Sequence, residues 1–391
     1  MDVSAALDRF DAGFDAEELV ELAAAFIQVP TGIPLGFDTY VDPTDPMFEH
    51  YLERVIPQLA NNPTVDIIDC RPFGVVARLG SGSPAVLIQS YSVSQHHQLM
   101  DDPYSPKVVD GRIWGRGVSQ SKGHQAVMVS VLRALGRARI NLQGTLLWSI
   151  NNEARSSHRC TGAILARLPV MPEFCLLQAP TSLRISLGNR GRIDVAVAIE
   201  GKASHSSTPE AGASAVEGAR RVMNRVTELS WASENHPDLG NRQAVVYKVD
   251  FEPVAPHTLP AVARLTIDRR LLPGDDPEAA VDELRDWIGE VPPYRISVDA
   301  AEHMLPAVVD PDDADVRTLA SIVSHLRRSS EVTFYAPGTF DAGATSARGI
   351  PTVMFGARGG DWPLGPDFVA IEDLRVEARA LGAFILRTLG A

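Results

Sequence analysis

Two arginines and one glycine-containing turn have chemistry suited to an anionic ligand. Arg190 and Arg192 each lie next to a glycine, and a guanidinium group can neutralise a carboxylate through paired N–H donors. The turn at Gly338 and Thr339 exposes backbone N–H groups, which can also bind a carboxylate. Arg190, Gly338 and Thr339 are therefore predicted to contact a ligand, and a surface charge is the alternative role of the two arginines.

Composition excludes several classes of function. The chain has 391 residues, a formal net charge of −13 and 45% hydrophobic residues, which predicts an ordinary globular protein large enough for two domains. The negative charge repels phosphate backbones, so nucleic acid is not expected as a partner. The sequence has no apolar run of about 18 residues and no basic N-terminus followed by one. We therefore expect a cytoplasmic protein without a membrane partner.

The three cysteines do not form a redox or metal motif. Cys70, Cys160 and Cys175 are an odd number without CxxC spacing, which favours reduced thiols over a disulfide framework. Cys160 alone lies in a polar context, and we interpret it as an unreactive loop thiol.

Hydrophobic periodicity predicts the elements that position these residues. The first half alternates helical and strand patterns, which is typical of a mainly parallel sheet with helices on its faces. Asp15 is expected to cap the first amphipathic helix, and a second helix covers 48–59. Buried strands are predicted at 75–79, 85–88, 145–150 and 174–177, with a helix opening near Lys122. The C-terminal part adds a helix at 316–326, strands near Val332 and at 352–355, and a helix at 371–389.

The order of elements changes between residues 188 and 302. A strand at 193–199, a helix at 213–229, strands at 245–251 and 263–267, a helix at 277–288 and a strand near Ile296 follow one another. This order, strand-helix-strand-strand-helix-strand, is typical of a ferredoxin-like unit. The sequence therefore predicts an α/β body of residues 1–187 and 303–391, into which an α+β domain of residues 188–302 is inserted.

Separate motifs occur along nearly the whole chain in the order found in one enzyme family. They are Asp102 to Pro106, Asp110-Gly111, Gly115-Arg116-Gly117 with Lys122-Gly123, Gly201 to Ser207 with Pro209, Leu259-Pro260, Asp268-Arg269-Arg270 and Pro337 to Asp341. The chain thus resembles the M20 metallopeptidase and amidohydrolase family, which includes acetylornithine deacetylase, succinyl-diaminopimelate desuccinylase and carboxypeptidase G2. The resemblance implies a zinc-peptidase-like body with an inserted lid or dimerisation domain, and a homodimer formed through that domain.

The chain departs from the family pattern where the resemblance places two zinc ions. It has Tyr91 at a histidine ligand, Gln120 at the bridging aspartate, Asn152 at the general-base glutamate, Ala179 at an acidic ligand and Leu364 near the last histidine. Val93 replaces a supporting aspartate, and only Glu153 keeps the chemistry of a ligand. Since neutral side chains cannot offset the repulsion between two cations, we expect no paired-zinc site and no cofactor.

The resemblance also gives His205 a role. In the family the lid-domain histidine reaches the active site, often across a dimer, and polarises a carbonyl or binds an anion. Taken alone His205 would more often be structural, but within Ser204-His205-Ser206-Ser207 we predict ligand binding. Lys122 is interpreted as part of the loop and helix start.

Three functions remain open. The first is metal-independent condensation, cyclisation, isomerisation or elimination on a small peptide-like or N-acyl amino-acid molecule. Its site would comprise Tyr91, Ser92, Gln120, Asn152 and Glu153, with Glu153 as acid or base if burial raises its pKa and His205 as an oxyanion or carboxylate partner. The second is a non-catalytic ligand-binding protein. The third is a metal-dependent amidohydrolase with a rebuilt ligand set that draws on His96, His97, His124, or His158 with Cys160.

Overall fold

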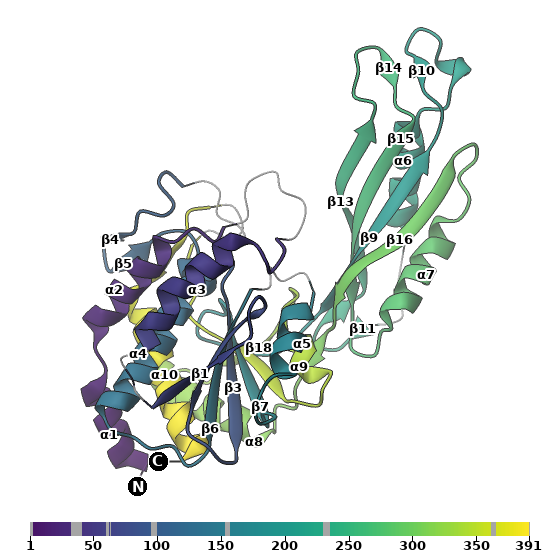
Figure 1. Ribbon diagram of the computed structural model, residues 1–391. Helices are drawn as coiled ribbons and strands as arrows, with labels where there is room; N and C mark the ends of the chain where they lie inside the picture. Colours follow the sequence, from purple (N-terminus) through teal and green to yellow (C-terminus); the bar gives the residue numbers. More distant parts are fainter. Residues whose placement is uncertain are drawn as a thin grey trace. The chain divides into compact units, whose positions relative to one another are not determined.

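The computed structural model describes residues 3–32, 41–59, 62, 64–94, 100–152, 157–229, 235–360 and 365–390. The chain divides into two compact units (Figure 1). Unit 1 comprises Met1–Gly188, Val308–Tyr335 and Ala344–Ala391, and unit 2 comprises Asn189–Ala307 and Ala336–Gly343. Each unit has its own hydrophobic core. The assignment of catalytic-type body and lid roles to the predicted segments stays a prediction.

Unit 1 is built on a nine-stranded mixed sheet flanked by helices, which confirms the predicted fold class. Parallel pairs occupy its centre, where β3 pairs with β6 and β7, and β7 pairs with β19. Antiparallel pairs β1–β2, β2–β6 and β8–β19 lie on either side. The strands are β1 (Val65–Asp69), β2 (Gly74–Leu79), β3 (Ala85–Tyr91), β6 (Thr145–Asn151), β7 (Phe174–Gln178), β8 (Ile185–Asn189), β17 (Ala307–Val308), β18 (Thr333–Ala336) and β19 (Thr352–Phe355).

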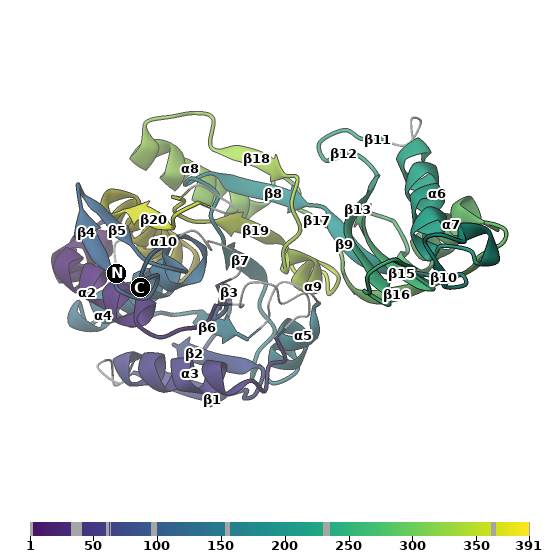
Figure 2. The same cartoon turned by 90° about the horizontal axis from the view of Figure 1, so that it is seen from above.

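Helices cover this sheet because each has one apolar face to bury. The Asp15 side chain accepts hydrogen bonds from the backbone N–H groups of Glu17 and Glu18, so it caps α2 (Ala16–Ile27) as predicted. Helices α4 (Gly123–Arg137) and α10 (Ile371–Leu389) pack against each other, and α10 also contacts β3 and β6 (Figure 2). The other helices are α1 (Val3–Gly13), α3 (Pro46–Leu59), α5 (Arg159–Leu165), α8 (Ala314–Arg327) and α9 (Ala342–Ser346).

Unit 2 contains the predicted ferredoxin-like arrangement. Its chain order is β9 (Gly191–Glu200), α6 (Ala215–Glu228), β13 (Gln243–Glu252), β15 (Val262–Leu271), α7 (Pro277–Ile288) and β16 (Arg295–Met304). The antiparallel sheet has the order β13-β15-β9-β16, and its core combines alternate strand residues with the apolar faces of α6 and α7. Asp276 caps α7 through the Ala279 N–H, with Pro277 at the first turn, where its missing N–H costs nothing.

Three small sheets complete the described elements. The strands β4 (Lys107–Val109), β5 (Arg112–Trp114) and β20 (Phe368–Ala370) form one of them. The pairs β10 (Ser204–His205) with β14 (Thr258–Leu259), and β11 (Asn235–His236) with β12 (Gly240–Asn241), form the other two. Over the described ranges, no helix combines the length and the apolar character needed to cross a membrane.

Candidate functional site

The carboxyl ends of three neighbouring parallel strands bring several predicted site residues to one edge of the unit 1 sheet. Tyr91 ends β3 and lies opposite Asn151, the last residue of β6, while Gln178 ends the neighbouring β7. Ligands of open α/β sheets bind at such strand ends. The Tyr91 side chain is fully buried, and its carbonyl accepts a hydrogen bond from the Gln125 side chain.

Ser92 and Asn152 form a direct contact at this edge. The Ser92 hydroxyl donates to Asn152 Oδ1 at 2.9 Å, and Asn152 Nδ2 donates to the Pro72 carbonyl at 2.6 Å. Both side chains are buried. The structure thus brings these two predicted residues together, with each end of the Asn152 amide engaged by the protein. An amide held in this way cannot act as the general base that the resemblance places at position 152.

Gln120 lies in a π-helical turn, Val118–Lys122, which runs into α4. Gly117 precedes the turn with φ of 90°, a left-handed conformation that favours glycine. The buried Asp367 carboxylate accepts from Gly117 N at 2.6 Å and from the Ser119 hydroxyl at 2.7 Å. Sequence reasoning placed Gln120 at a functional loop but missed both the π-turn and Asp367. Such turns often occur at functional positions.

Lys122 closes the π-turn inside the protein rather than at its surface. Its ammonium donates to the Val29 carbonyl at 2.6 Å and lies 5.8 Å and 5.2 Å from the ring centroids of Tyr51 and Tyr104. Burial lowers the pKa of Lys122 to about 7, against the opposing effect of the Asp367 charge. These contacts support the expected role of Lys122 in the loop and helix start.

A buried histidine–glutamate pair, which sequence reasoning did not identify, lies next to these strand ends. His124 Nδ1 is 2.9 Å and 3.0 Å from the two carboxylate oxygens of Glu377 on α10. Gln178 Nε2 also donates to Glu377 at 2.9 Å, and the Ala357 N–H donates at 2.8 Å. The sequence contains one weak signal for this pair. Glu377 falls among the apolar positions of the amphipathic pattern over 371–389, where a charged side chain is not expected.

The described side chains at the predicted ligand positions do not fit a pair of zinc ions. Tyr91, Gln120, Asn152 and Ala179 are buried and offer no carboxylate, imidazole or thiolate. Across the ranges that the structure covers, no group of three or more His, Cys, Asp or Glu side chains is arranged to hold a metal ion. The predicted residues that lie outside the described ranges are Glu153, His96, His97, Asp361, Trp362, Pro363 and Leu364.

The other predicted positions of unit 1 are structural in character. Val93 is buried. His158 precedes α5 without capping it through its side chain, and Cys160 is a buried cysteine in the first turn of that helix. Cys160 is therefore helical and not a loop thiol, which corrects the sequence interpretation.

Unit 2 gathers a second set of predicted residues around two guanidinium groups. The Arg190 backbone N–H donates to the Gly338 carbonyl at 3.1 Å, and Arg190 Nε donates to the Leu239 carbonyl at 2.7 Å. The Arg270 guanidinium donates to the Thr339 hydroxyl at 2.8 Å. Burial and the Arg270 charge lower the pKa of Arg190. The structure thus joins Arg190, Gly338 and Thr339, and it adds Arg270, which the sequence had marked only as part of a motif.

Arg192 belongs to a different set of contacts. Its guanidinium lies 3.5 Å from the Asp194 carboxylate, while Arg270 is 2.7 Å from Asp268. Burial raises the pKa of Asp268, and the neighbouring arginines oppose that rise.

His205 is exposed on β10, and its ring is oriented by the chain that follows it. The Ser207 N–H donates to His205 Nδ1 at 3.2 Å, and the Ser207 hydroxyl lies 2.8 Å from the same nitrogen. Because Nδ1 accepts, a neutral ring carries its hydrogen on Nε2. His205 therefore presents an outward N–H donor, which suits a carbonyl or carboxylate oxygen better than a metal ion. The His257 ring lies 6.0 Å away, centroid to centroid.

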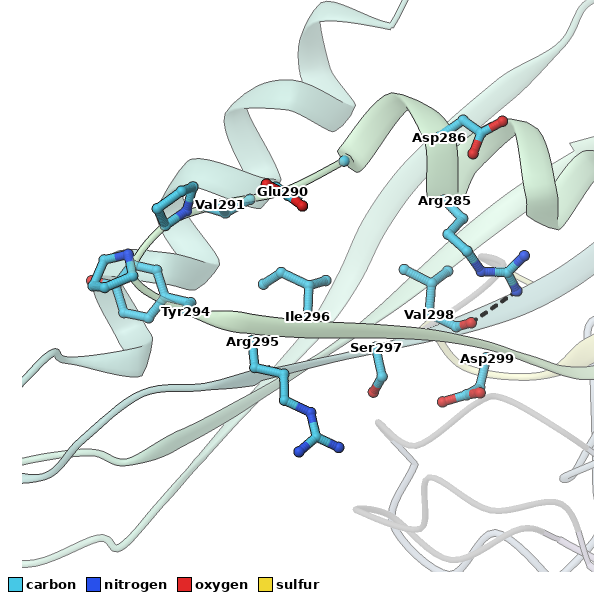
Figure 3. Close-up of a pocket in the computed structure, with 13 residues that line it drawn as sticks. Arg285, Asp286, Glu290, Val291, Tyr294, Arg295, Ile296, Ser297, Val298 and Asp299 are labelled. Carbon is cyan, nitrogen blue, oxygen red and sulfur yellow. Dashed lines mark hydrogen bonds between the residues drawn. The ribbon is translucent and has the colours of Figure 1, made fainter.

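A surface groove of about 850 Å³ in unit 2 contains none of the predicted site residues. Figure 3 shows it between the end of α7 and strand β16, with Arg285 donating to the Val298 carbonyl at 3.1 Å. Its charged side chains include both signs, Arg295 with Asp286 and Asp299. Ser297 lies in the groove, but no histidine is among the lining residues to activate its hydroxyl, so the two clusters above are the better candidates.

Comparisons with known proteins connect these units to one family. A family model described as a peptidase dimerisation domain matches residues 187–295. The uncharacterized protein YgeY of Escherichia coli (strain K12) is 26% identical over 226 residues, which cover 56% of this chain and 56% of that protein. Acetylornithine deacetylase of Proteus mirabilis (strain HI4320) is 26% identical over 254 residues, which cover 62% of this chain and 64% of that enzyme. The chain thus spans less than two thirds of the length of both relatives.

Solved structures match over almost the whole chain. The dipeptidase Dug1p from Saccharomyces cerevisiae gives a TM-score of 0.78 at 13% identity and covers 100% of this chain and 99% of that chain. The M20 family metallo-carboxypeptidase Sso-CP2 from Sulfolobus solfataricus gives 0.76 at 15% identity, over 95% of this chain and 99% of that chain. The fold is therefore that of the M20 peptidases with their dimerisation domain. The dimerisation-domain match, the deacetylase relatives and the peptidase structures all relate the chain to the M20 family.

Proposed function

We propose that this protein belongs to the M20 family, has a degenerate di-zinc site and acts on a small peptide-like or N-acyl amino-acid molecule without metal. The observation that carries the proposal is the set of buried neutral side chains at Tyr91, Gln120, Asn152 and Ala179. Metal-activated hydrolysis needs anionic or imidazole ligands and a carboxylate that takes a proton from water. The described residues at these positions supply neither.

Unit 2 supports the class of ligand. The Arg270 guanidinium donates to Thr339 and is close enough to Arg190 for its charge to lower the pKa of Arg190. The repulsion between two such cations falls when an anion binds between them. His205 lies beyond the opposite end of β9 from Arg190, so within unit 2 its ring is a separate contact for a carbonyl oxygen and not part of this cluster. A carboxylate and an acyl carbonyl are the two groups shared by dipeptides and N-acyl amino acids. Glu153 stays a proposed acid or base.

One observation favours a second candidate, a ligand-binding protein without turnover. The Asn152 amide is engaged at both ends, by Ser92 and by the Pro72 carbonyl, so this pair acts as a structural link between strand ends. A site whose polar groups are satisfied within the protein retains its shape without being chemically active. Ligand binding in the absence of any product distinguishes this candidate.

A homodimer is part of the proposal, and the match to a peptidase dimerisation domain supports it. Strand β13 is at one edge of its sheet, and it exposes Val249 and Phe251, which are 46% and 44% exposed. Val216 on α6 is also exposed, at 42%. Apolar side chains on an edge strand and the neighbouring helix are suited to bury each other across a two-fold axis.

The experiment is a turnover and binding screen of N-acetyl amino acids and dipeptides, with and without 1,10-phenanthroline, in the wild type and in Arg270→Lys. Chelator-resistant product formation supports the proposal. Arg270→Lys keeps the charge but loses the fork of donors, so binding should weaken roughly tenfold while the fold is unchanged. Binding without product would establish the second candidate. Activity abolished by chelator and restored by zinc would establish a metal-dependent hydrolase instead.

A further inference from the structure

The His124–Glu377 pair has a fixed proton arrangement. Gln178 Nε2 and the Ala357 N–H can only donate, so they occupy one Glu377 oxygen each as acceptors. His124 Nδ1 lies within 3.0 Å of both oxygens, so with Glu377 ionised it carries a hydrogen directed at the carboxylate. The orientation of Gln178 is set independently, because its Oε1 accepts from the Ser90 hydroxyl at 2.5 Å. Proton gain and loss by the ring consequently take place at Nε2.

His124 Nε2 is buried and has no hydrogen-bond partner among the described residues. A buried polar atom without a partner is costly, so its retention calls for a partner from outside the described protein. The ring also requires a glycine beside it: a Cβ on Gly356 would lie 2.6 Å from His124 Cε1 and 2.7 Å from the Ala179 carbonyl oxygen. The imidazole and the Ala179 carbonyl thus both lie beside Gly356, which places His124 near one of the substituted ligand positions.

The neighbouring polar groups are already committed to the protein. The Lys122 ammonium donates to the Val29 carbonyl, the Asn152 amide is engaged at both ends, and the Asp367 carboxylate holds the π-turn. Glu377 itself accepts three hydrogen bonds. Among these side chains of the described edge, His124 is thus the one with a titratable atom, Nε2, that has no partner in the described protein.

We propose that His124, oriented by Glu377, is the acid–base residue of this site. This inference rests on the proposed function and supplies its chemistry. Nε2 takes a proton from an N–H or O–H group of the bound molecule, which leaves an imidazolium paired with the Glu377 carboxylate, and the same proton returns to the ligand or leaves to water in the next step. No oxidation is involved. The Glu377 charge stabilises the imidazolium in the way a carboxylate does in other histidine-based sites.

Few charged groups lie near the His124 imidazole in the described structure. Glu377 is the charged group in contact with it. On the same helix Asp373 lies one turn earlier, and burial with the charge of Glu372 raises the pKa of Asp373. Lys122 precedes α4 and donates to Val29 and Ile27, while β7 and the segment after β19 present the neutral Gln178, Ala179 and Gly356.

The test is a pH titration of the protein labelled with ¹⁵N-histidine, followed by NMR of the ring nitrogens. The His124 signals are identified by their loss in His124→Gln or, if that variant does not fold, by their shift in Glu377→Gln. The proposal predicts reversible protonation of Nε2 within the pH range in which the protein stays folded, and an at least tenfold lower proton affinity in Glu377→Gln. The matched control, Glu372→Gln on the exposed face of α10, should leave both unchanged.

A His124 ring that stays in one protonation state over this range, with Nε2 closed to exchange, would overturn the inference and make the pair a sealed structural link. Equal titration in the wild type and Glu377→Gln would also overturn it, because the carboxylate would not act on the ring. Neither result affects the metal-free function, which fails separately if the purified protein holds zinc.

Discussion

Replacing Lys122 with methionine should change how stability depends on pH. Lys122 is fully buried, and burial lowers its pKa from the ordinary 10.5 to about 7. Between these two values the unfolded chain binds a proton that the folded chain does not bind. Stability of the wild type therefore rises with pH through this window, whereas below pH 7 both states are protonated and the residue adds no pH dependence.

The size of the effect follows from the same interval. One pKa unit corresponds to about 1.4 kcal/mol, so the full window from 7 to 10.5 represents at most about 5 kcal/mol, and the step from pH 7 to 9 represents roughly 3 kcal/mol. Lys122→Met keeps a flexible chain of similar volume and removes this component. The stability of the wild type relative to the variant should thus increase by up to roughly 3 kcal/mol between pH 7 and 9.

Urea unfolding at pH 6, 7, 8 and 9 measures this difference for the wild type, Lys122→Met and Lys107→Met. Lys107 is an exposed lysine on β4 of the same unit, and its replacement should leave the pH dependence of the wild type in place. Parallel pH profiles for the wild type and Lys122→Met would refute the reasoning, because the buried ammonium would then carry its proton in the folded state throughout.

Three further predictions concern stability and assembly. Ser92→Ala leaves Asn152 Oδ1 buried without its donor and should lower the free energy of unfolding by about 1–2 kcal/mol. The control, Ser130→Ala, removes a buried hydroxyl that has no partner among the described residues. It should leave the free energy of unfolding unchanged in the same urea assay. Asp367→Asn removes the charge that holds the π-turn and should cost about 3 kcal/mol, with unchanged stability contradicting that role. Phe251→Lys should shift the protein toward monomer in sedimentation velocity, while Val108→Lys on β4 should not; equal effects would exclude the β13 edge as the dimer contact.

Much of the fold could be predicted because the spacing of apolar residues along the sequence indicates which face of a helix or strand is buried. The helices at 277–288 and 371–389 have the bounds predicted from sequence, since each is a continuous amphipathic pattern with a clear start. The strands at the centre of the unit 1 sheet were also found, as short apolar runs buried on both faces. The ferredoxin-like order of unit 2 followed from the same reasoning.

The candidate site was only partly predictable because its key contacts join residues far apart in sequence. Glu377 reaches His124 from 253 positions away, and Asp367 reaches Gly117 from 250 positions away. No local pattern encodes such pairs. Arg190 and Thr339 were identified separately from their residue types, but the Arg270 guanidinium that links them to one cluster was visible only in three dimensions.

Metal content directly tests whether the protein has lost its di-zinc site. Elemental analysis counts the metal ions bound per chain. It is done on protein purified without an affinity tag, before and after incubation with excess zinc. We expect folded protein with far less than one metal ion per chain in both samples. Tightly held zinc near one or two ions per chain would contradict this expectation and would restore a metal-dependent hydrolase with ligands beyond Tyr91, Gln120, Asn152 and Ala179.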